Sequence, residues 1–276
     1  MAGTLFVVGT PIGNLGDFSP RAVEVLNAVD FIAAEDTRVT LKLLNHFGIK
    51  KPMVSYYEHN RAERGEKIID RLLAGESCAL VSDAGMPIIS DPGEDLTALC
   101  YENSIKVCAV PGPCALVTAL SISGMPAGRF TFEGFLTVTK KNRREHLLSL
   151  VDEKRTMVFY EAPHKLPSTL ADLAEYLGDR RIALVKELTK IYESVEHTTL
   201  FEAAEKYKDA NIKGEYVLIV EGKPEEEEEI PTLDGAVKIA RKLMDEGSSL
   251  NEAAKEAAKK TGLKKSDIYK SLQSEE

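Results

Sequence analysis

The sequence predicts an α/β protein with two α/β domains and a small helical appendage at its carboxyl-terminal end. Short apolar runs alternate with helical patterns along most of the chain, which is typical of a mostly parallel sheet covered by helices. Two of the apolar runs, residues 78–81 and 105–110, lead directly into Gly/Pro-rich turns at residues 82–93 and 111–115. Ligands of open α/β sheets bind beyond the carboxyl ends of the strands, so these turns predict one small-molecule site.

The first α/β domain is predicted over residues 1–120. Its expected strands are residues 5–8, 31–34, 53–55, 78–81 and 105–110. Its expected helices are residues 20–28, 39–47, 62–73 and 94–102. Ser19 is the expected N-cap of the first helix, and Gly48 and Gly75 are expected to close the second and third, because these residue types favour those positions.

The second α/β domain is predicted over residues 121–224. Its expected strands are residues 130–135, 156–160, 181–185 and 216–220, and its expected helices are residues 143–151 and 166–177. The run of glutamates at residues 225–229 predicts an acidic linker that spans residues 225–232.

The appendage is predicted over residues 233–276. Three helical segments are expected there, at residues 233–246, 251–260 and 265–272, with turns at Gly247 and Gly262. The pattern is similar to an RNA-binding helix-turn-helix, although three helices around a small core would show the same pattern without binding anything.

Composition and charge narrow the class of protein. The net charge of −9 over 276 residues argues against nucleic-acid binding through overall charge alone. Basic residues nevertheless form two clusters: Lys140, Lys141, Arg143 and Arg144; and Lys255, Lys259, Lys260, Lys264, Lys265 and Lys270. These clusters suit RNA phosphates, and solvated helix faces are the alternative. The four cysteines show no metal-ligand or disulfide spacing, and neither a signal peptide nor a membrane span is predicted, so a cytoplasmic protein without a metal is expected.

Several familiar chemistries lack their sequence motifs. The turn at residues 9–14 is neither a dinucleotide fingerprint nor a phosphate-binding loop. The chain also lacks a G-x-S-x-G elbow, an H-E-x-x-H motif and a credible Cys/His pair. Nicotinamide chemistry, nucleoside triphosphate chemistry and hydrolysis by a covalent nucleophile are therefore not supported.

The remaining motifs are specific in combination. They are V-G-T-P-I-G-N-L (8–15), A-A-E-D-T-R (33–38), S-D-A-G-M-P-I-I-S-D-P-G (82–93), P-G-P-C-A (111–115), E-G-F-L (133–136), F-Y-E-A-P-H-K (159–165), K-E-L-T-K (186–190) and G-E-Y-V-L-I-V-E-G (214–222). In this order they closely resemble the bacterial 16S rRNA cytidine 2'-O-methyltransferase family, within the tetrapyrrole methylase superfamily.

The resemblance implies a fold, a cofactor and partners. It implies two α/β domains with S-adenosylmethionine in the cleft between them, a homodimer, and 16S rRNA of the small ribosomal subunit as substrate. The residues that it places at the cofactor are Pro11, Ile12, Asp83, Gly85, Met86, Cys114, Ala115, Tyr160, Leu188 and Glu215. The alternative for Asp83 is a carboxylate that only shapes its turn, and the alternative for Met86 and Ala115 is ordinary core packing.

Methyl transfer to a ribose hydroxyl requires positioning of the reactants and removal of the hydroxyl proton. The candidate catalytic residues are Glu35, Asp36, Arg38 and Lys186, and further candidates for the base are Glu161 and Glu187. Each is, as a lone residue, more often a member of a structural ion pair. Arg38 has two alternatives, an RNA phosphate or a pair with Glu35.

Other functions stay open at this point. A methyltransferase of the same fold acting on a small molecule such as a tetrapyrrole is one alternative, and a non-catalytic nucleic-acid-binding protein is another. The basic clusters favour RNA. The loop residues Tyr56, Tyr57, His59 and Asn60 suit an exposed base, but they are also ordinary loop residues.

Overall fold

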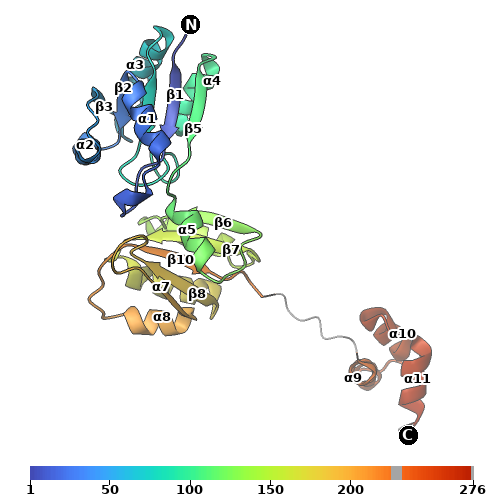
Figure 1. Ribbon diagram of the computed structural model, residues 1–276. Coiled ribbons are helices and arrows are strands. Elements are labelled where there is room, and N and C mark those ends of the chain that lie inside the picture. Colours follow the sequence, from blue (N-terminus) through green and yellow to red (C-terminus); the bar gives the residue numbers. More distant parts are fainter. Residues whose placement is uncertain (225–231, 275–276) are drawn as a thin grey trace. The chain divides into compact units, whose positions relative to one another are not determined.

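The computed structural model describes residues 1–224 and 232–274. The chain divides into two compact units, Met1–Lys223 and Pro224–Glu276, which are described separately (Figure 1). The glutamate run predicted as a linker, residues 225–229, lies outside the described residues. Within the described ranges, the helices are all too short or too polar to cross a bilayer.

The first sheet of the larger unit has five parallel strands in the order β3-β2-β4-β1-β5. The strands are β1 Thr4–Val8, β2 Phe31–Ala34, β3 Met53–Ser55, β4 Cys78–Val81 and β5 Lys106–Val110. Every residue of β2 and β4 is buried, which explains why these strands are continuous apolar runs without alternation. Because the strands are parallel, the turns that follow them gather at one edge of the sheet.

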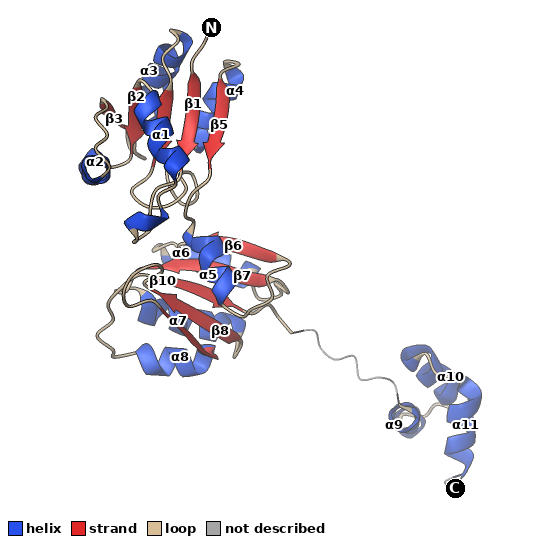
Figure 2. Ribbon diagram, in the orientation of Figure 1, coloured by secondary structure: helices blue, strands red, loops and turns tan. Residues whose placement is uncertain are grey.

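Helices cover both faces of this sheet (Figure 2). They are α1 Pro20–Ala28, α2 Thr37–His46, α3 Arg61–Leu73 and α4 Glu94–Glu102, and a short 3-10 turn spans Leu15–Asp17. Leu26 and Leu44 bring α1 and α2 into one core, and Leu72 and Leu96 bring α3 and α4 into the other. Ser19 caps α1 as predicted, since its side chain accepts a hydrogen bond from the Ala22 N–H.

The second sheet is mixed, with the order β6-β7-β10-β8-β9. The strands are β6 Phe130–Gly134, β7 Thr156–Glu161, β8 Arg181–Lys186, β9 Ser194–Thr199 and β10 Tyr216–Val220. Only β6 and β7 are parallel, and the other neighbours are antiparallel. The edge strand β9 was not expected, because its sequence, S-V-E-H-T-T, contains no apolar run.

Two groups of helices cover the second sheet. They are α5 Ala115–Ile122 on one face, and α6 Lys140–Ser149, α7 Leu166–Leu177 and α8 Leu200–Tyr207 on the other. Helix α5 lies against the second sheet (Figure 1). Its residues Leu116 and Leu120 belong to one buried cluster with Val158 and Val217 of that sheet. Although α5 begins before residue 121, where we expected the second domain to begin, its side chains therefore contribute to the core of the second sheet.

The smaller unit contains the expected three helices. They are α9 Leu233–Asp245, α10 Leu250–Thr261 and α11 Lys265–Ser274. Their small core contains Ala240, Ala253, Ala257 and Ile268, and short side chains let the helices approach closely. Gly262 ends α10 in the left-handed conformation at a φ of 70°, which confirms the predicted turn.

Candidate functional site

A cavity of about 430 Å³ lies where the turns at the carboxyl edge of the first sheet meet the second sheet. Its volume is within the range of about 300–1,000 Å³ that is typical of small-molecule sites. Asp83, after β4, and Cys114, after β5, both line it. Strand β7 contributes Tyr160, and the segments just after β8 and just before β10 contribute Leu188 and Glu215. The two Gly/Pro-rich turns thus line one cavity.

Close backbone contacts hold the turns of the first sheet together. A Cβ atom on Gly9 would lie 2.7 Å from the Gly112 Cα, so the two backbones touch at positions where a side chain does not fit. Thr10 and Gly85 form two backbone hydrogen bonds, from Thr10 N to Gly85 O at 2.9 Å and from Gly85 N to Thr10 O at 3.1 Å. Gly85 has a φ of 88°, a conformation that favours glycine. The turns after β1, β4 and β5 are therefore fixed relative to one another.

Carboxylates join the turns after β2 and β4. The Asp36 N–H donates to Asp83 Oδ1 at 3.1 Å, and the Asp83 N–H donates to Glu35 Oε2 at 3.4 Å. In both bonds a carboxylate oxygen is the acceptor, and a carboxylate accepts most strongly when it is ionised. Asp83 therefore both shapes the turns, as its alternative held, and presents a carboxylate to the cavity.

The cavity is acidic. Its charged lining residues are Glu35, Asp83, Asp91, Glu161 and Glu215, and among the described residues that line it there is no Lys, Arg or His. Burial, followed by repulsion from neighbouring carboxylates, raises the pKa of Glu35 and of Asp91, the latter to about 6. Burial raises the pKa of Asp83 as well. A cationic small molecule would relieve this repulsion, so the lining suits a positively charged ligand.

Tyr160 forms the aromatic wall of the cavity. Its ring packs edge-on against Phe132 and Phe135, with centroid distances of 4.9 and 5.5 Å. Its hydroxyl accepts a hydrogen bond from the Leu116 N–H at 2.9 Å. This N–H lies in the first turn of α5, where backbone donors have no partner within the helix. Burial raises the pKa of Tyr160, so its hydroxyl stays neutral.

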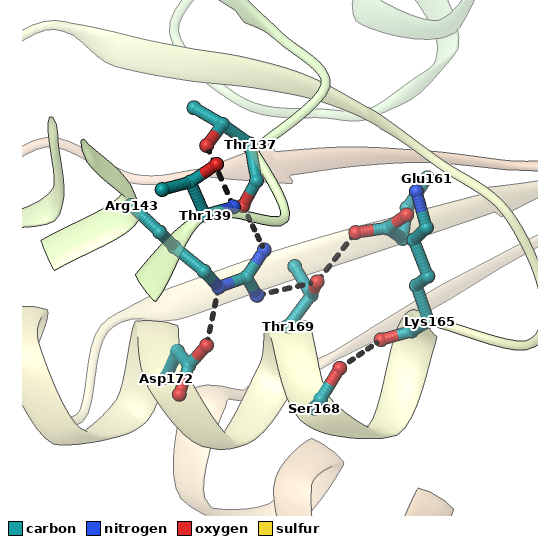
Figure 3. Close-up of polar contacts among 8 residues, drawn as sticks. All are labelled: Thr137, Thr139, Arg143, Glu161, Lys165, Ser168, Thr169 and Asp172. Atoms are coloured by element: carbon teal, nitrogen blue, oxygen red, sulfur yellow. Dashed lines mark hydrogen bonds and ion pairs between the residues drawn. The ribbon is translucent and has the colours of Figure 1, made fainter. Parts of the chain in front are cut away.

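Glu161 lines the cavity and is held in a polar network (Figure 3). It is 3% exposed, and its carboxylate accepts hydrogen bonds from the Thr169 hydroxyl and, at 2.9 Å, from the Ala162 N–H. The Thr169 hydroxyl in turn accepts from Arg143 Nη2 at 2.8 Å, and Arg143 Nε pairs with Asp172 Oδ2 at 2.5 Å. Glu161 is thus a fixed structural acceptor.

The same network changes the interpretation of the first basic cluster. The Arg143 side chain is only 14% exposed and is paired with Asp172, so its charge serves the packing of α6 against α7. The other members of the cluster, Lys140, Lys141 and Arg144, are exposed.

The predicted catalytic residues Asp36 and Arg38 pair with each other. Arg38 Nη2 lies 2.6 Å from Asp36 Oδ2, and this guanidinium lowers the pKa of Asp36 to about 2. The partner of Arg38 is therefore Asp36, which differs from the pair with Glu35 that the sequence analysis considered. Asp36 and Arg38 are not among the described residues that line the cavity.

The remaining candidates for the base occupy different environments. Lys186 Nζ lies 5.9 Å from the ring centroid of Tyr216 and does not line the cavity in the described structure. Glu187 accepts from Lys190 and from the Glu215 N–H, both at 2.9 Å. Of the candidates for the base, Glu35 and Glu161 line the cavity in the described structure, and Glu161 is the one held by Thr169.

The cavity contains most of the predicted cofactor residues. Those that line it are Ile12, Asp83, Gly85, Met86, Cys114, Ala115, Tyr160, Leu188 and Glu215, and Pro11 does not. The lining residues that the sequence analysis did not single out are Ala84, Ile89, Ser90, Asp91, Phe135, Ala162, Pro163, Val185, Tyr216 and Val217. Most of them belong to the motifs quoted above. Within those motifs, Asp91 is a carboxylate and Phe135 an aromatic residue, and both residue types could have been predicted at a ligand site. Val185 and Val217 are apolar strand residues that carry no such signal.

Comparison with solved structures shows the class of fold. The chain is similar to diphthine synthase, with a TM-score of 0.61, 16% identity and coverage of 80% of this chain and 90% of that one. It is also similar to uroporphyrin-III-C-methyltransferase from Thermus thermophilus, with a TM-score of 0.57, 19% identity and coverage of 79% and 94%. The chain belongs to the tetrapyrrole (corrin/porphyrin) methylases, whose family model matches residues 4–204.

Curated relatives within this family are similar over almost the whole chain. The chain is 45% identical to "Ribosomal RNA small subunit methyltransferase I" of Synechocystis sp., over 97% of this chain and 96% of the relative. It is 45% identical to the protein of the same name from Escherichia coli O157:H7, over 97% and 94%, and 46% identical to that from Pseudomonas aeruginosa, over 97% and 96%. The expected fold and the expected enzyme class, a methyltransferase that uses S-adenosylmethionine, are thereby confirmed.

Proposed function

We propose that this protein transfers a methyl group from S-adenosylmethionine to the ribose 2'-hydroxyl of a cytidine in 16S rRNA of the small ribosomal subunit. The observation that carries the proposal is the acidic cavity between the turns of the first sheet and the second sheet. The names of the curated relatives support the class of substrate.

The described residues fit the proposed methyl donor. Bound S-adenosylmethionine supplies a methyl group on a positively charged sulfur, which a hydroxyl oxygen can attack directly. Asp83 and Glu215 offer carboxylates to the positive charges of the donor, and the turn at Gly85 offers backbone groups. Tyr160 and Leu188 supply apolar walls that exclude water.

The negative charge of the cavity favours methylation of RNA over methylation of a tetrapyrrole. Tetrapyrrole precursors carry several carboxylates, which would meet Glu35, Asp83 and Asp91 without a basic partner among the described lining residues. In RNA the ribose hydroxyl is uncharged, so it can enter an acidic site while the phosphates stay outside.

Basic side chains for those phosphates are not among the described residues that line the cavity. Lys140, Lys141 and Arg144 are exposed on α6. The smaller unit exposes Lys255, Lys259, Lys260, Lys264 and Lys265 on or beside α10 and α11. We infer that these exposed side chains contact the RNA backbone, which would make binding strongly dependent on salt.

A homodimer and a cytoplasmic location complete the proposal. Val117 and Ile122 of α5 are 49% and 42% exposed, and such apolar side chains on a helix that covers the sheet suit a subunit contact. The four free cysteines suit a reducing compartment. Light scattering of the full-length protein gives the oligomeric state directly.

One experiment tests the reaction and its target together. Ribose methylation is mapped across rRNA from cells with and without this protein, and the purified protein is then supplied with labelled S-adenosylmethionine and small ribosomal subunits from the deficient cells. Loss of one 2'-O-methylcytidine in 16S rRNA, restored by the protein, is expected. An unchanged map, or transfer only to a tetrapyrrole panel, would contradict the proposal.

A further inference from the structure

The loop between β8 and β9, residues 187–193, exposes two large apolar side chains at its tip. Ile191 is 95% exposed and Tyr192 is 77% exposed, which are the highest values for large apolar residues of the described chain after Met1. Single apolar residues are common on protein surfaces, whereas neighbouring ones beside a ligand cavity mark a contact surface. Ile191 and Tyr192 are called the loop tip below.

Ion pairs and hydrogen bonds hold this loop in one conformation. Lys190 Nζ lies 2.9 Å from Glu187 Oε1 and 2.9 Å from Glu215 Oε2. The Thr189 N–H donates to Glu193 Oε2 at 2.6 Å, and the Glu193 N–H donates to the Lys190 carbonyl at 3.1 Å. The residues on both sides of the loop tip are therefore fixed, so the exposure of the tip does not come from a loosely held loop.

The conformation of the loop is costly. Glu187 and Thr189 have φ values of 51° and 64°, and the left-handed region is especially unfavourable for a β-branched residue such as threonine. Thr189 Oγ1 is also buried without a hydrogen-bond partner among the described residues. Costs of this kind are retained mainly where the conformation serves a site.

The loop tip lies beside the cavity. Leu188 lines the cavity, and so does Glu215, the partner of Lys190. On the side of the first sheet, a Cβ atom on Gly13 would lie 2.7 Å from Lys190 Cγ, and Ile12 before it lines the cavity as well. Because the tip follows directly after Lys190, it borders the cavity that receives the acceptor in the proposed function.

An exposed lysine accompanies the loop tip. Lys213 precedes β10 in a segment that packs against the loop. Two arginines at the carboxyl edge of the first sheet are paired, Arg38 with Asp36 and Arg61 with Asp95. Lys213, by contrast, has no ion-pair partner within residues 1–224 and 232–274, so its charge is available to a phosphate.

We propose that the loop tip and Lys213 bind the RNA strand next to the target nucleoside; this rests on the proposed function. A ribose that enters the cavity draws its nucleotide away from the neighbouring base, which then loses a stacking partner. The Tyr192 ring replaces that partner, and Ile191 inserts beside it. Lys213 binds an adjacent phosphate. Apolar side chains with a cation beside them match the alternation of bases and phosphates along RNA.

The sequence analysis considered other aromatic residues for contact with a base. Of these, Tyr56 is buried in the core and cannot stack with a ligand. Tyr192 follows the K-E-L-T-K motif at residues 186–190 and was not considered, because its exposure depends on the fixed turn before it.

The first test measures methyl transfer to small ribosomal subunits, with S-adenosylmethionine affinity measured by calorimetry. The double variant Ile191→Ala/Tyr192→Ala is expected to raise KM for the subunit about tenfold or more with unchanged donor affinity, because stacking contributes to substrate binding. Tyr192→Phe keeps the ring and should retain the wild-type KM. Tyr101→Ala, at a residue 69% exposed on α4, is the matched control. An unchanged KM in the double variant would overturn the proposal.

Light scattering and photo-crosslinking separate contact with RNA from contact with a second copy of the chain. The double variant should keep the oligomeric state of wild type. Replacement of Tyr192 by photoreactive p-benzoylphenylalanine should give crosslinks to 16S rRNA next to the methylated cytidine. A changed oligomeric state, a crosslink between two copies of the chain, or no crosslink to rRNA would overturn the proposal.

Salt dependence tests the lysine separately from the loop tip. Lys213→Met should lower affinity for the subunit and reduce the slope of log affinity against log salt by about 1, whereas the double variant should keep the wild-type slope. Lys106→Met, at an exposed residue that begins β5 and so lies at the opposite edge of the first sheet, is the control. An unchanged slope in Lys213→Met would contradict the phosphate contact. Failure of wild type to methylate the subunits would instead contradict the proposed function.

Discussion

The Tyr160 hydroxyl accepts a hydrogen bond from the Leu116 N–H at 2.9 Å. This bond joins β7 of the second sheet to the first turn of α5, directly after the turn that brings Cys114 to the cavity. It thus fixes the wall of the site that comes from the second sheet against a turn that comes from the first.

Tyr160→Phe should weaken both stability and donor binding. The substitution keeps the ring contacts but leaves a part-buried N–H without its partner, which costs about 1–3 kcal/mol in the free energy of unfolding. We expect a several-fold loss in S-adenosylmethionine affinity by calorimetry. Tyr192→Phe, at an exposed residue, is the control, and equal behaviour of the two variants would contradict this role.

Arg143→Met should destabilise the protein without weakening RNA binding. It removes the pair with Asp172 and the hydrogen bond to Thr169, and we expect a loss of about 1–3 kcal/mol in urea unfolding. Arg144→Met, at the next residue on the exposed side of α6, should leave stability unchanged and lower RNA affinity. The opposite pattern would show that Arg143 contacts RNA.

Asp91→Asn should stabilise the folded protein at neutral pH. The pKa of Asp91 is raised from an ordinary value of 3.8 to about 6, so the folded state binds the proton more tightly than the unfolded state. Wild-type stability therefore falls as pH rises from about 4 to about 6, and the asparagine variant avoids this loss. Thermal unfolding should show a higher Tm for the variant at pH 7.5 and equal Tm values near pH 3.5. A lower Tm at pH 7.5 would contradict this electrostatic account.

The basic cluster of α10 and α11 should control RNA affinity and its salt dependence. Replacing both Lys259 and Lys260 by glutamate should lower affinity for the subunit about tenfold or more and reduce the slope of log affinity against log salt by about 2, with donor affinity unchanged. Lys238→Glu on α9 is the control in the same unit, because it lies outside the cluster. Filter binding at several salt concentrations measures both quantities, and an unchanged slope would exclude the cluster from the interface.

The parts of the structure that follow local rules were predictable. Apolar runs and caps gave strands such as β2 and helices such as α1 with their observed bounds, because burial and capping depend on neighbouring residues. The edge strand β9 was missed because half-exposed polar residues carry no apolar signal. Helix α5 was missed because its residues are apolar on all sides and lie between Pro113 and Gly124.

The candidate site was predictable as a set of turns, whereas its pairings were not. The motifs placed Asp83 and Cys114 at one cavity, since parallel strands end at the same edge. The pair of Arg38 with Asp36 and the network around Glu161 depend on three-dimensional contacts that no spacing encodes. Asp91 was overlooked because its position depends on the unusual φ values of the residues before it.

Calorimetric titration of S-adenosylmethionine into the full-length protein and its Asp83→Asn variant tests the central claim most directly, because this substitution removes one negative charge from the cavity while conserving the shape of the side chain. The account predicts one donor bound per chain in wild type and an affinity at least about tenfold weaker in the variant, with Asp95→Asn unchanged. Donor binding of equal affinity in all three proteins, or no binding to wild type, would contradict it.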